Sequence, residues 1–203
     1  GNIAYADYRR WHQVEKNWRT GTYSVNSLEG HSGSVCSCEL MAGMLMSAGE
    51  DGTIKWWDVI SQNLVWTELQ AHRGPIWDVK ADVGAGSHRK GEHLFTVSSD
   101  STIKVWDCCR NQRFEEASPM KCLQVLRGHR PGSEVWCVDV DASNIFSGGR
   151  DGLVKVWDRE TGANYQTLTK HTGSVFVVRP AKAEGDTAGL SLGQSVLTGG
   201  GDG

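Results

Sequence analysis

The chain has 203 residues, of which 38% are apolar, and its formal net charge is −3 at neutral pH. This length fits one or two ordinary domains, and no long block of like charge argues for binding to nucleic acid. No apolar run approaches the roughly 20 residues that a membrane helix needs, and the first residues lack the apolar core of a signal peptide. We therefore expect no nucleic acid and no membrane among the partners, and a cytoplasmic or nuclear location.

Residues 1–21 differ in composition from the rest of the chain and predict a short N-terminal helix. Tyr8, Trp11 and Trp18 recur at helical spacings, so they would stack on one side, and Gly21 follows as a plausible end. The simplest interpretation is a helix that packs on the rim of the domain that follows. Residues 22–28 then alternate in the manner of a strand, with Tyr23 and Val25 on its apolar side.

One short pattern then occurs four times, at residues 47–58, 96–107, 147–158 and 198–203. In each complete copy a Ser or Thr lies four residues before an Asp, and a Trp lies six residues after that Asp. A His precedes every copy. The repeated polar residues are His31, Ser47, Asp51, Trp57; His72, Thr96, Asp100, Trp106; His129, Ser147, Asp151, Trp157; and His171, Thr198, Asp202.

A Gly-His opening, an Asp-Gly turn and a Trp-Asp ending in this order resemble the WD-repeat (WD40) family. The resemblance covers the chain from about Ser24 onward and implies an all-β fold, a β-propeller of four-stranded blades. Three blades are expected at residues 31–69, 72–126 and 129–168, and part of a fourth at 171–203, so we interpret domain 22–203 as a partial propeller whose other blades lie beyond the chain. In such a ring, residues 22–28 would complete the last blade.

The repeated Ser, His and Asp residues also suggest the triad of a hydrolase. Repetition argues against catalysis, because an enzyme needs such a set once, and no serine here lies in a Gly-x-Ser-x-Gly turn. We interpret each set as a buried relay in which Trp, Ser or Thr, His and Asp satisfy one another's hydrogen bonds, the structural tetrad of the family. We therefore expect no enzyme activity.

The family resemblance also implies where a peptide would bind. The top face is the end of the propeller that carries two kinds of turn: those from the fourth strand of one blade to the first strand of the next, and those from the second strand to the third within a blade. Three sets of positions surround the mouth of the central channel on this face. One set supplies aromatic side chains in three of the four blades, which suits peptide anchoring. Its alternative use is packing between blades. The candidate peptide-binding residues are Cys36, Glu50, Trp77, Ser99, Glu134, Trp136, Arg150 and Phe176.

A second resemblance concerns the linker. The phrase Asn17-Trp18-Arg19-x-Gly21, within residues 9–25, is similar to the segment that joins an F-box to its propeller in F-box/WD-repeat proteins. It implies a substrate-recognition subunit of an SCF ubiquitin ligase, with the adaptor and cullin bound through an F-box upstream. The alternative is a non-catalytic scaffold in another pathway, such as chromatin, trafficking or RNA processing.

The remaining predictions concern cysteines and loops. No pair among Cys36, Cys38, Cys108, Cys109, Cys122 and Cys137 has metal-knuckle spacing. We interpret them as reduced thiols that act as small hydrophobic side chains, and expect neither metal nor cofactor. Insertions at 81–93, 108–120 and 181–194 are expected to gather on the face opposite the top face, because alternate turns of an antiparallel sheet lie at the same end.

Overall fold

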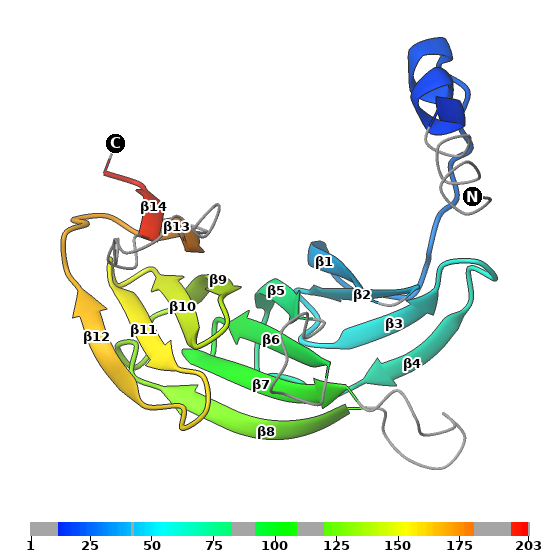
Figure 1. Cartoon of the computed structure of the whole chain (residues 1–203). Coiled ribbons are helices and arrows are strands. Elements are labelled where there is room, and N and C mark those ends of the chain that lie inside the picture. Colours follow the sequence, from blue (N-terminus) through cyan, green and yellow to red (C-terminus); the bar gives the residue numbers. More distant parts are fainter. Residues whose placement is uncertain (1–11, 42, 83–91, 109–119, 181–195, 203) are drawn as a thin grey trace.

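A computed structural model describes residues 12–41, 43–82, 92–108, 120–180 and 196–202 of the chain. Within them, three four-stranded antiparallel sheets and one two-stranded sheet follow one another along an arc (Figure 1). Each sheet is built from consecutive strands, so each is one blade. The prediction of an all-β partial propeller with a short N-terminal helix is confirmed.

The blades have these strands. Blade one contains β1 (Val35–Met41), β2 (Met44–Gly49), β3 (Ile54–Asp58) and β4 (Leu64–Glu68). Blade two contains β5 (Ile76–Asp82), β6 (His93–Ser98), β7 (Thr102–Cys108) and β8 (Met120–Arg127). Blade three contains β9 (Val135–Val140), β10 (Asn144–Gly149), β11 (Val154–Asp158) and β12 (Asn164–Leu168), and blade four contains β13 (Val175–Pro180) and β14 (Val196–Gly200).

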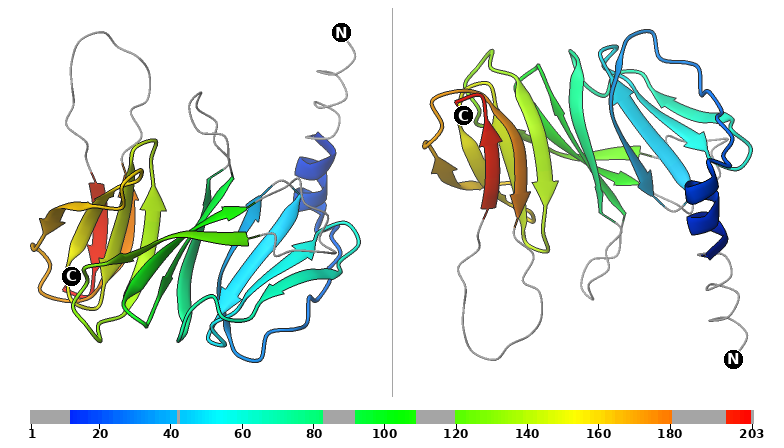
Figure 2. Two further views of the ribbon diagram at one scale, coloured as in Figure 1. Left: turned by 90° about the horizontal axis from the view of Figure 1, so that it is seen from below. Right: turned by 90° about the horizontal axis from the view of Figure 1, so that it is seen from above.

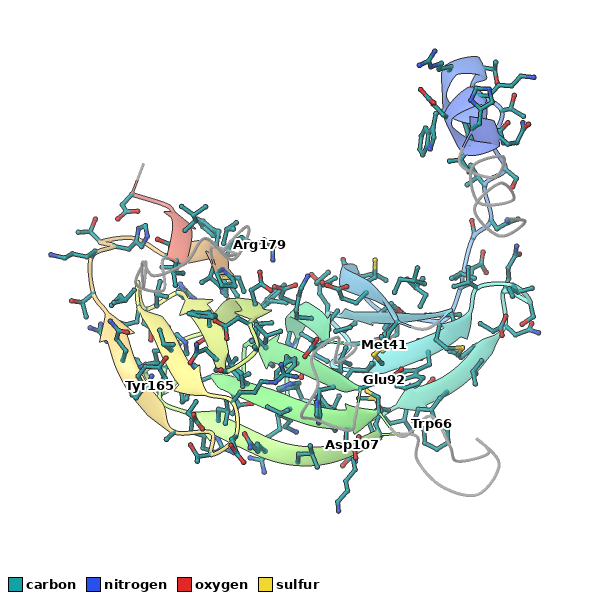
Figure 3. All side chains as sticks on the ribbon, viewed as in Figure 1. Met41, Trp66, Glu92, Asp107, Tyr165 and Arg179 are labelled. Carbon is teal, nitrogen blue, oxygen red and sulfur yellow. The ribbon has the colours of Figure 1, made fainter. Side chains whose placement is uncertain are left out.

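The first strand of every blade lies on the concave side of the arc, and the fourth strand of blades one to three lies on the convex side. Figures 1 and 2 show β1, β5, β9 and β13 along the inside and the sheets stacked face to face. Figure 3 places Arg179 on the concave side and Tyr165 on the convex side. The hydrogen-bonded order within each blade, from inner to outer strand, agrees with this arrangement.

Apolar side chains fill the space between neighbouring blades. Phe95 and Ile103 of blade two pack with Val135, Ile145 and Trp157 of blade three, and all five are almost completely buried. Burying one such side chain contributes about 1.5 to 3 kcal/mol. In blades two and three, consecutive side chains of a strand therefore point to two faces that are both buried, because each of these sheets has a neighbouring blade on both sides.

Polar side chains also connect the inner strands across blades. Asp78 of β5 accepts hydrogen bonds from the Ser37 hydroxyl in blade one (2.9 Å) and from the Val138 N–H in blade three (3.1 Å). Burial raises the pKa of Asp78, although these hydrogen bonds act in the opposite direction. Its carboxylate therefore links three consecutive blades.

The N-terminal segment departs from the prediction. Residues 12–20 form a helix, and Gly21 ends it with a φ of 65° while the Thr22 N–H donates to the Asn17 carbonyl. The expected strand at 22–28 is absent from the described structure, and Tyr23 and Val25 are exposed. A strand needs a neighbouring strand for its backbone hydrogen bonds, and no described strand lies beside this segment.

The helix stands away from the four described sheets in Figure 1, so no packing on these blades is seen. Trp18 is 81% exposed. Tyr8 and Trp11, which were expected to stack with it, lie outside the described residues. No described helix is long and apolar enough to cross a membrane.

The prediction for the cysteines is only partly correct. Cys108 and Cys137 are buried, whereas Cys36, Cys38 and Cys122 are exposed. Cys36 and Cys38 lie on β1 of blade one, a blade that has a described neighbouring blade on one face only. Cys122 lies on the outer strand β8. Cys109 and the greater part of the inserted loops, at 83–91, 109–119 and 181–195, lie outside the described residues.

Candidate functional site

Tight turns place the repeated polar residues. The Asp carboxylate that follows the second strand accepts the N–H two residues later, as Asp51 does from Thr53 and Asp151 from Leu153. Gly52 and Gly152 occupy the left-handed region between them, with φ of 71° and 73°. Blade two has Ser101 at this place with a φ of 68°, although few side chains adopt that conformation.

The carboxylate at this turn meets the His that precedes the first strand. In blade one the Trp57 indole N–H donates to Ser47 Oγ at 2.8 Å, His31 Nε2 lies 2.8 Å from Ser47 Oγ, and His31 Nδ1 lies 2.8 Å from Asp51 Oδ2. The same contacts, all between 2.7 and 3.1 Å, connect the corresponding residues of blades two and three. They are Trp106, Thr96, His72, Asp100; and Trp157, Ser147, His129, Asp151.

Each Asp also fixes the turn before the first strand, because it accepts the N–H of the residue after the His. These donors are Ser32, Arg73, Arg130 and Thr172, at 2.8 to 3.1 Å. One carboxylate therefore joins both turns that form the top face of its blade. A regular pair of turns at every blade is the frame on which exposed side chains can converge.

The hydrogen bonds keep these carboxylates ionised. Burial by itself would raise the pKa of Asp151, but His129 and the N–H groups of Arg130 and Leu153 lower it to about 2. In blade two, burial likewise acts to raise the pKa of Asp100, but hydrogen bonds with His72 and Thr102 hold this pKa well below its usual range. Burial lowers the pKa of His72 despite Asp100 beside it. A neutral His between a carboxylate and a hydroxyl fits these shifts.

Blade four differs in exposure. His171 contacts Asp202 and Thr198 at 2.8 Å, as in the other blades, yet Asp202 is exposed. In the described structure, the polar set of blade four is therefore less buried than those of the other three blades. Only two strands of this blade are described, and no described Trp donates a hydrogen bond to Thr198.

A β-bulge explains how the first set of peptide-binding candidates reaches the top face. The pairing of the first and second strands skips one residue in every blade, and the skipped residues are Cys36, Trp77, Trp136 and Phe176. A bulge re-aims the side chain of the extra residue out of the regular alternation. The second set of top-face positions consists of the residues two before the bulge residue, and the third set of the residues before each tetrad Asp. These two sets are joined to each other, because the backbone N–H of Glu50, Ser99, Arg150 and Gly201 donates to the carbonyl of Ser34, Pro75, Glu134 and Ser174, respectively.

The structure brings the candidates together most closely between blades three and four. The rings of Trp136 and Phe176 lie 4.7 Å apart between centroids, and the Trp136 indole N–H donates to Glu134 Oε2 at 2.8 Å. Phe176 is 47% exposed, and Arg150 is exposed. The Arg150 carbonyl lies 3.5 Å from the Ser174 hydroxyl of blade four, which acts as its donor. These residues form an aromatic surface that holds the Glu134 carboxylate, and the backbone of the exposed Arg150 is hydrogen-bonded to Glu134 and Ser174 beside it.

The other candidates do not join this surface through any described contact. Cys36 is exposed on blade one, where Glu50 accepts the Ser34 N–H at 3.3 Å. The indole nitrogen of Trp77 is buried without a hydrogen-bond partner. In the described part of the chain, no three His, Cys, Asp or Glu residues are placed to hold a metal ion.

Two top-face arginines were missed from the sequence. Arg73 and Arg130 both follow a tetrad His, and both are exposed. The signal was present in the repeat itself, since they occupy the same position in successive blades.

Comparison with known proteins identifies the repeats. The family described as "WD domain, G-beta repeat" matches residues 22–58, 63–107 and 120–158. Eukaryotic translation initiation factor 3 subunit I of Bombyx mori is 33% identical over 106 residues, which cover 51% of this chain and 27% of that protein. Nuclear distribution protein PAC1 of Arthroderma otae is 30% identical over 175 residues, which cover 81% of this chain and 35% of that protein. This chain thus spans about a third or less of their lengths.

Solved structures show the same fold. The WD40 β-propeller domain of Doa1 aligns with a TM-score of 0.58 and 30% identity, covering 78% of this chain and 47% of that one. The computationally designed Ika4 protein aligns with a TM-score of 0.65 and 23% identity, covering 89% and 94%. None of the relatives named here is called an F-box protein, so they give the F-box subtype no support. What the repeats, the tetrads and the comparisons establish together is that this chain belongs to the WD-repeat family.

Proposed function

We propose that this chain is a non-catalytic scaffold that holds a segment of a partner protein against its top face. The observation that carries the proposal is the contact between Trp136 and Phe176, two aromatic side chains from neighbouring blades beside the concave side of the arc. Large aromatic side chains at the centre of a surface supply most of the free energy in protein recognition. Glu134 and Arg150 flank the pair and would select the partner by charge.

The tetrads support a structural role rather than catalysis. Ser147 and Thr96 are completely buried, so no substrate reaches their hydroxyl groups. The Ser147 oxygen already accepts the Trp157 indole N–H at 2.9 Å while it contacts His129 at 2.8 Å. A hydroxyl that must act as a nucleophile needs an open approach, and these have none.

The test replaces both rings at once. We expect Trp136→Ala with Phe176→Ala to remove the partners that the full-length protein captures in cells, measured by quantitative mass spectrometry, while circular dichroism shows that the variant is still folded at the temperature of the assay. Leu123→Ala is the control, because Leu123 is 45% exposed on the outer strand β8, close to the 47% of Phe176. An unchanged set of partners in the double variant would contradict the proposal.

A second candidate is the ubiquitin-ligase function, in which the propeller presents a substrate and an upstream F-box binds the adaptor and cullin. It depends on Asn17, Trp18, Arg19 and Gly21, and the exposure of Trp18 suits contact with another domain. The scaffold interpretation is preferred because the named relatives include no F-box protein. Co-purification of the full-length protein with the adaptor and cullin, lost on Trp18→Ala, would support the second candidate.

A further inference from the structure

Three top-face arginines have fixed backbones and free side chains. Arg73 and Arg130 donate their backbone N–H groups to Asp100 Oδ2 (3.1 Å) and Asp151 Oδ2 (3.0 Å). The Arg150 N–H donates to the Glu134 carbonyl at 2.9 Å. All three arginines are exposed. Their guanidinium groups therefore project from rigid turns of blades two and three.

No carboxylate of the described residues neutralises these three groups. Arg19, Arg159 and Arg179 each form an ion pair, with Glu15, Asp82 and Asp139, respectively, whereas Arg73, Arg130 and Arg150 form none within the described structure.

The carboxylates nearest in sequence are already occupied. Asp100 and Asp151 bind the His residues of their tetrads. Glu134 holds the Trp136 indole. The arginine charges are thus available to a ligand.

We infer that the top face binds an acidic, unphosphorylated peptide segment, whose apolar side chain rests on Trp136 and Phe176 and whose carboxylates meet Arg150, Arg130 and Arg73. This inference rests on the proposed function and adds the chemistry of the partner. A guanidinium binds a carboxylate through two parallel hydrogen bonds, which gives both strength and orientation. The rigid backbone of the three turns lowers the entropy lost when these pairs form.

The distribution of the arginines over two blades favours several carboxylates over a single phosphate. Arg73 comes from the turn before β5 of blade two, whereas Arg130 comes from the equivalent turn of blade three, so an extended ligand would meet them at separate points. Recognition of a phosphorylated motif relies instead on several arginines converging on one group. Nucleic acid is a poorer fit, because the chain carries a net charge of −3 and Glu50 adds negative charge to the same face.

The first experiment selects ligands without assuming their sequence. The full chain is used to select from a display library of random peptides of roughly 12 residues. We expect the selected peptides to be enriched in Asp and Glu around one aromatic or aliphatic residue. Enrichment of Lys and Arg, or no preference in charge, would overturn the inference.

The second experiment measures the affinity of one selected peptide by fluorescence anisotropy. The triple variant Arg73→Glu, Arg130→Glu, Arg150→Glu should weaken binding by about tenfold or more, because like charges then face each other. The control carries the same change in charge elsewhere, as Lys16→Glu, Arg19→Glu, Lys121→Glu, and should bind like the wild type. Thermal unfolding of both triple variants checks that the fold is kept.

Two further comparisons distinguish a carboxylate ligand from a phosphate ligand, and distinguish failure of this inference from failure of the proposed function. The same peptide with phosphoserine at its acidic positions, and a single-stranded oligouridine, should each bind more weakly than the carboxylate peptide; tighter binding of either overturns the inference. If Trp136→Ala abolishes binding while the arginine triple variant does not, the proposed function stands and the inference fails. If neither variant changes binding, both fail.

Discussion

Trp136 lies against Phe176 although the two residues belong to different sheets, with ring centroids 4.7 Å apart and an angle of 37° between the ring planes. Each is the bulge residue of its inner strand. Regular alternation would assign consecutive side chains to the two faces of a blade, and the bulge releases one side chain from this pattern. Repeating the bulge in successive blades makes these two released side chains neighbours.

The contact predicts an energetic coupling between the two rings. Tilted aromatic pairs contribute about 0.5 to 1.5 kcal/mol beyond the area they bury. A double-mutant cycle of Trp136→Ala and Phe176→Ala, measured by urea unfolding, should show a coupling in this range. The pairing of Trp136→Ala with Leu123→Ala is the control and should be additive within about 0.5 kcal/mol. Additive effects for the first pair would contradict the stacking.

A second prediction compares two indoles of blade one. Trp57→Phe removes the donor of a hydrogen bond to Ser47 Oγ in the buried tetrad, and should lower the free energy of unfolding by about 1 to 3 kcal/mol. Trp66→Phe should cost less, because the buried Trp66 indole nitrogen has no hydrogen-bond partner to lose. Chemical denaturation of both variants provides the measurement. Equal losses would show that packing, rather than the relay, makes Trp57 important.

A third prediction concerns pH. The folded pKa of Asp151 is lowered to about 2, whereas an unfolded Asp titrates near 3.9. A lowered folded pKa stabilises the protein above the unfolded pKa, and this contribution is lost as the pH falls from about 4 to about 2. Asp151→Asn should therefore be less stable at pH 7 and lose less stability over that range. Urea unfolding at several pH values tests this, and parallel curves for the two proteins would contradict it.

A fourth prediction concerns the space beside the tetrad of blade three. A Cβ at Gly149 would lie 2.9 Å from both the Glu134 carbonyl and His129 Nδ1. Gly149→Ala should therefore lower the free energy of unfolding by about 1 to 3 kcal/mol, as expected for overpacking. Gly199→Ala is the matched control in a second strand, because its Cβ would meet Val177 at an ordinary 3.9 Å. A melting temperature unchanged by Gly149→Ala would contradict the tight fit.

The sequence predicted the strands well because the repeat aligns them with one another. The copies of the repeat at 47–58, 96–107 and 147–158 end on the third strands of their blades, which are β3 (Ile54–Asp58), β7 (Thr102–Cys108) and β11 (Val154–Asp158). A shared offset from Asp to Trp in three copies fixes the turn and the third strand together. These strands can be predicted because their positions depend only on distances along the chain, which are read directly from the sequence.

Features that depend on a neighbour could not be predicted in this way. Residues 22–28 alternate like a strand, yet no described strand lies beside them, and alternation alone cannot supply a partner. Cys36 and Cys38 are exposed because blade one has a described neighbouring blade on one face only. The meeting of Trp136 and Phe176 depends on the angle between two blades, which their equivalent positions suggest but do not determine.

Arg159 gives the last prediction, because it connects two blades in a way that no motif indicated. It is 6% exposed, pairs with Asp82 of blade two, and donates to the Asp141 carbonyl of blade three at 3.0 Å. Its guanidinium also lies 5.1 Å from the centre of the Phe95 ring. Removing it takes one ion-pair partner from the partly buried Asp82 and a hydrogen-bond donor from the Asp141 carbonyl.

We therefore expect Arg159→Ala to lower the free energy of unfolding by about 1.5 to 3 kcal/mol, the usual range for a hydrogen bond to a charged group. Arg159→Lys should recover only part of this loss, because one ammonium cannot reproduce the planar fork of the guanidinium. Arg19→Ala breaks an exposed pair with Glu15 on the helix and should cost no more than about 0.5 kcal/mol. Equal effects of the two Arg→Ala substitutions in urea unfolding would show that Arg159 does not connect the blades energetically.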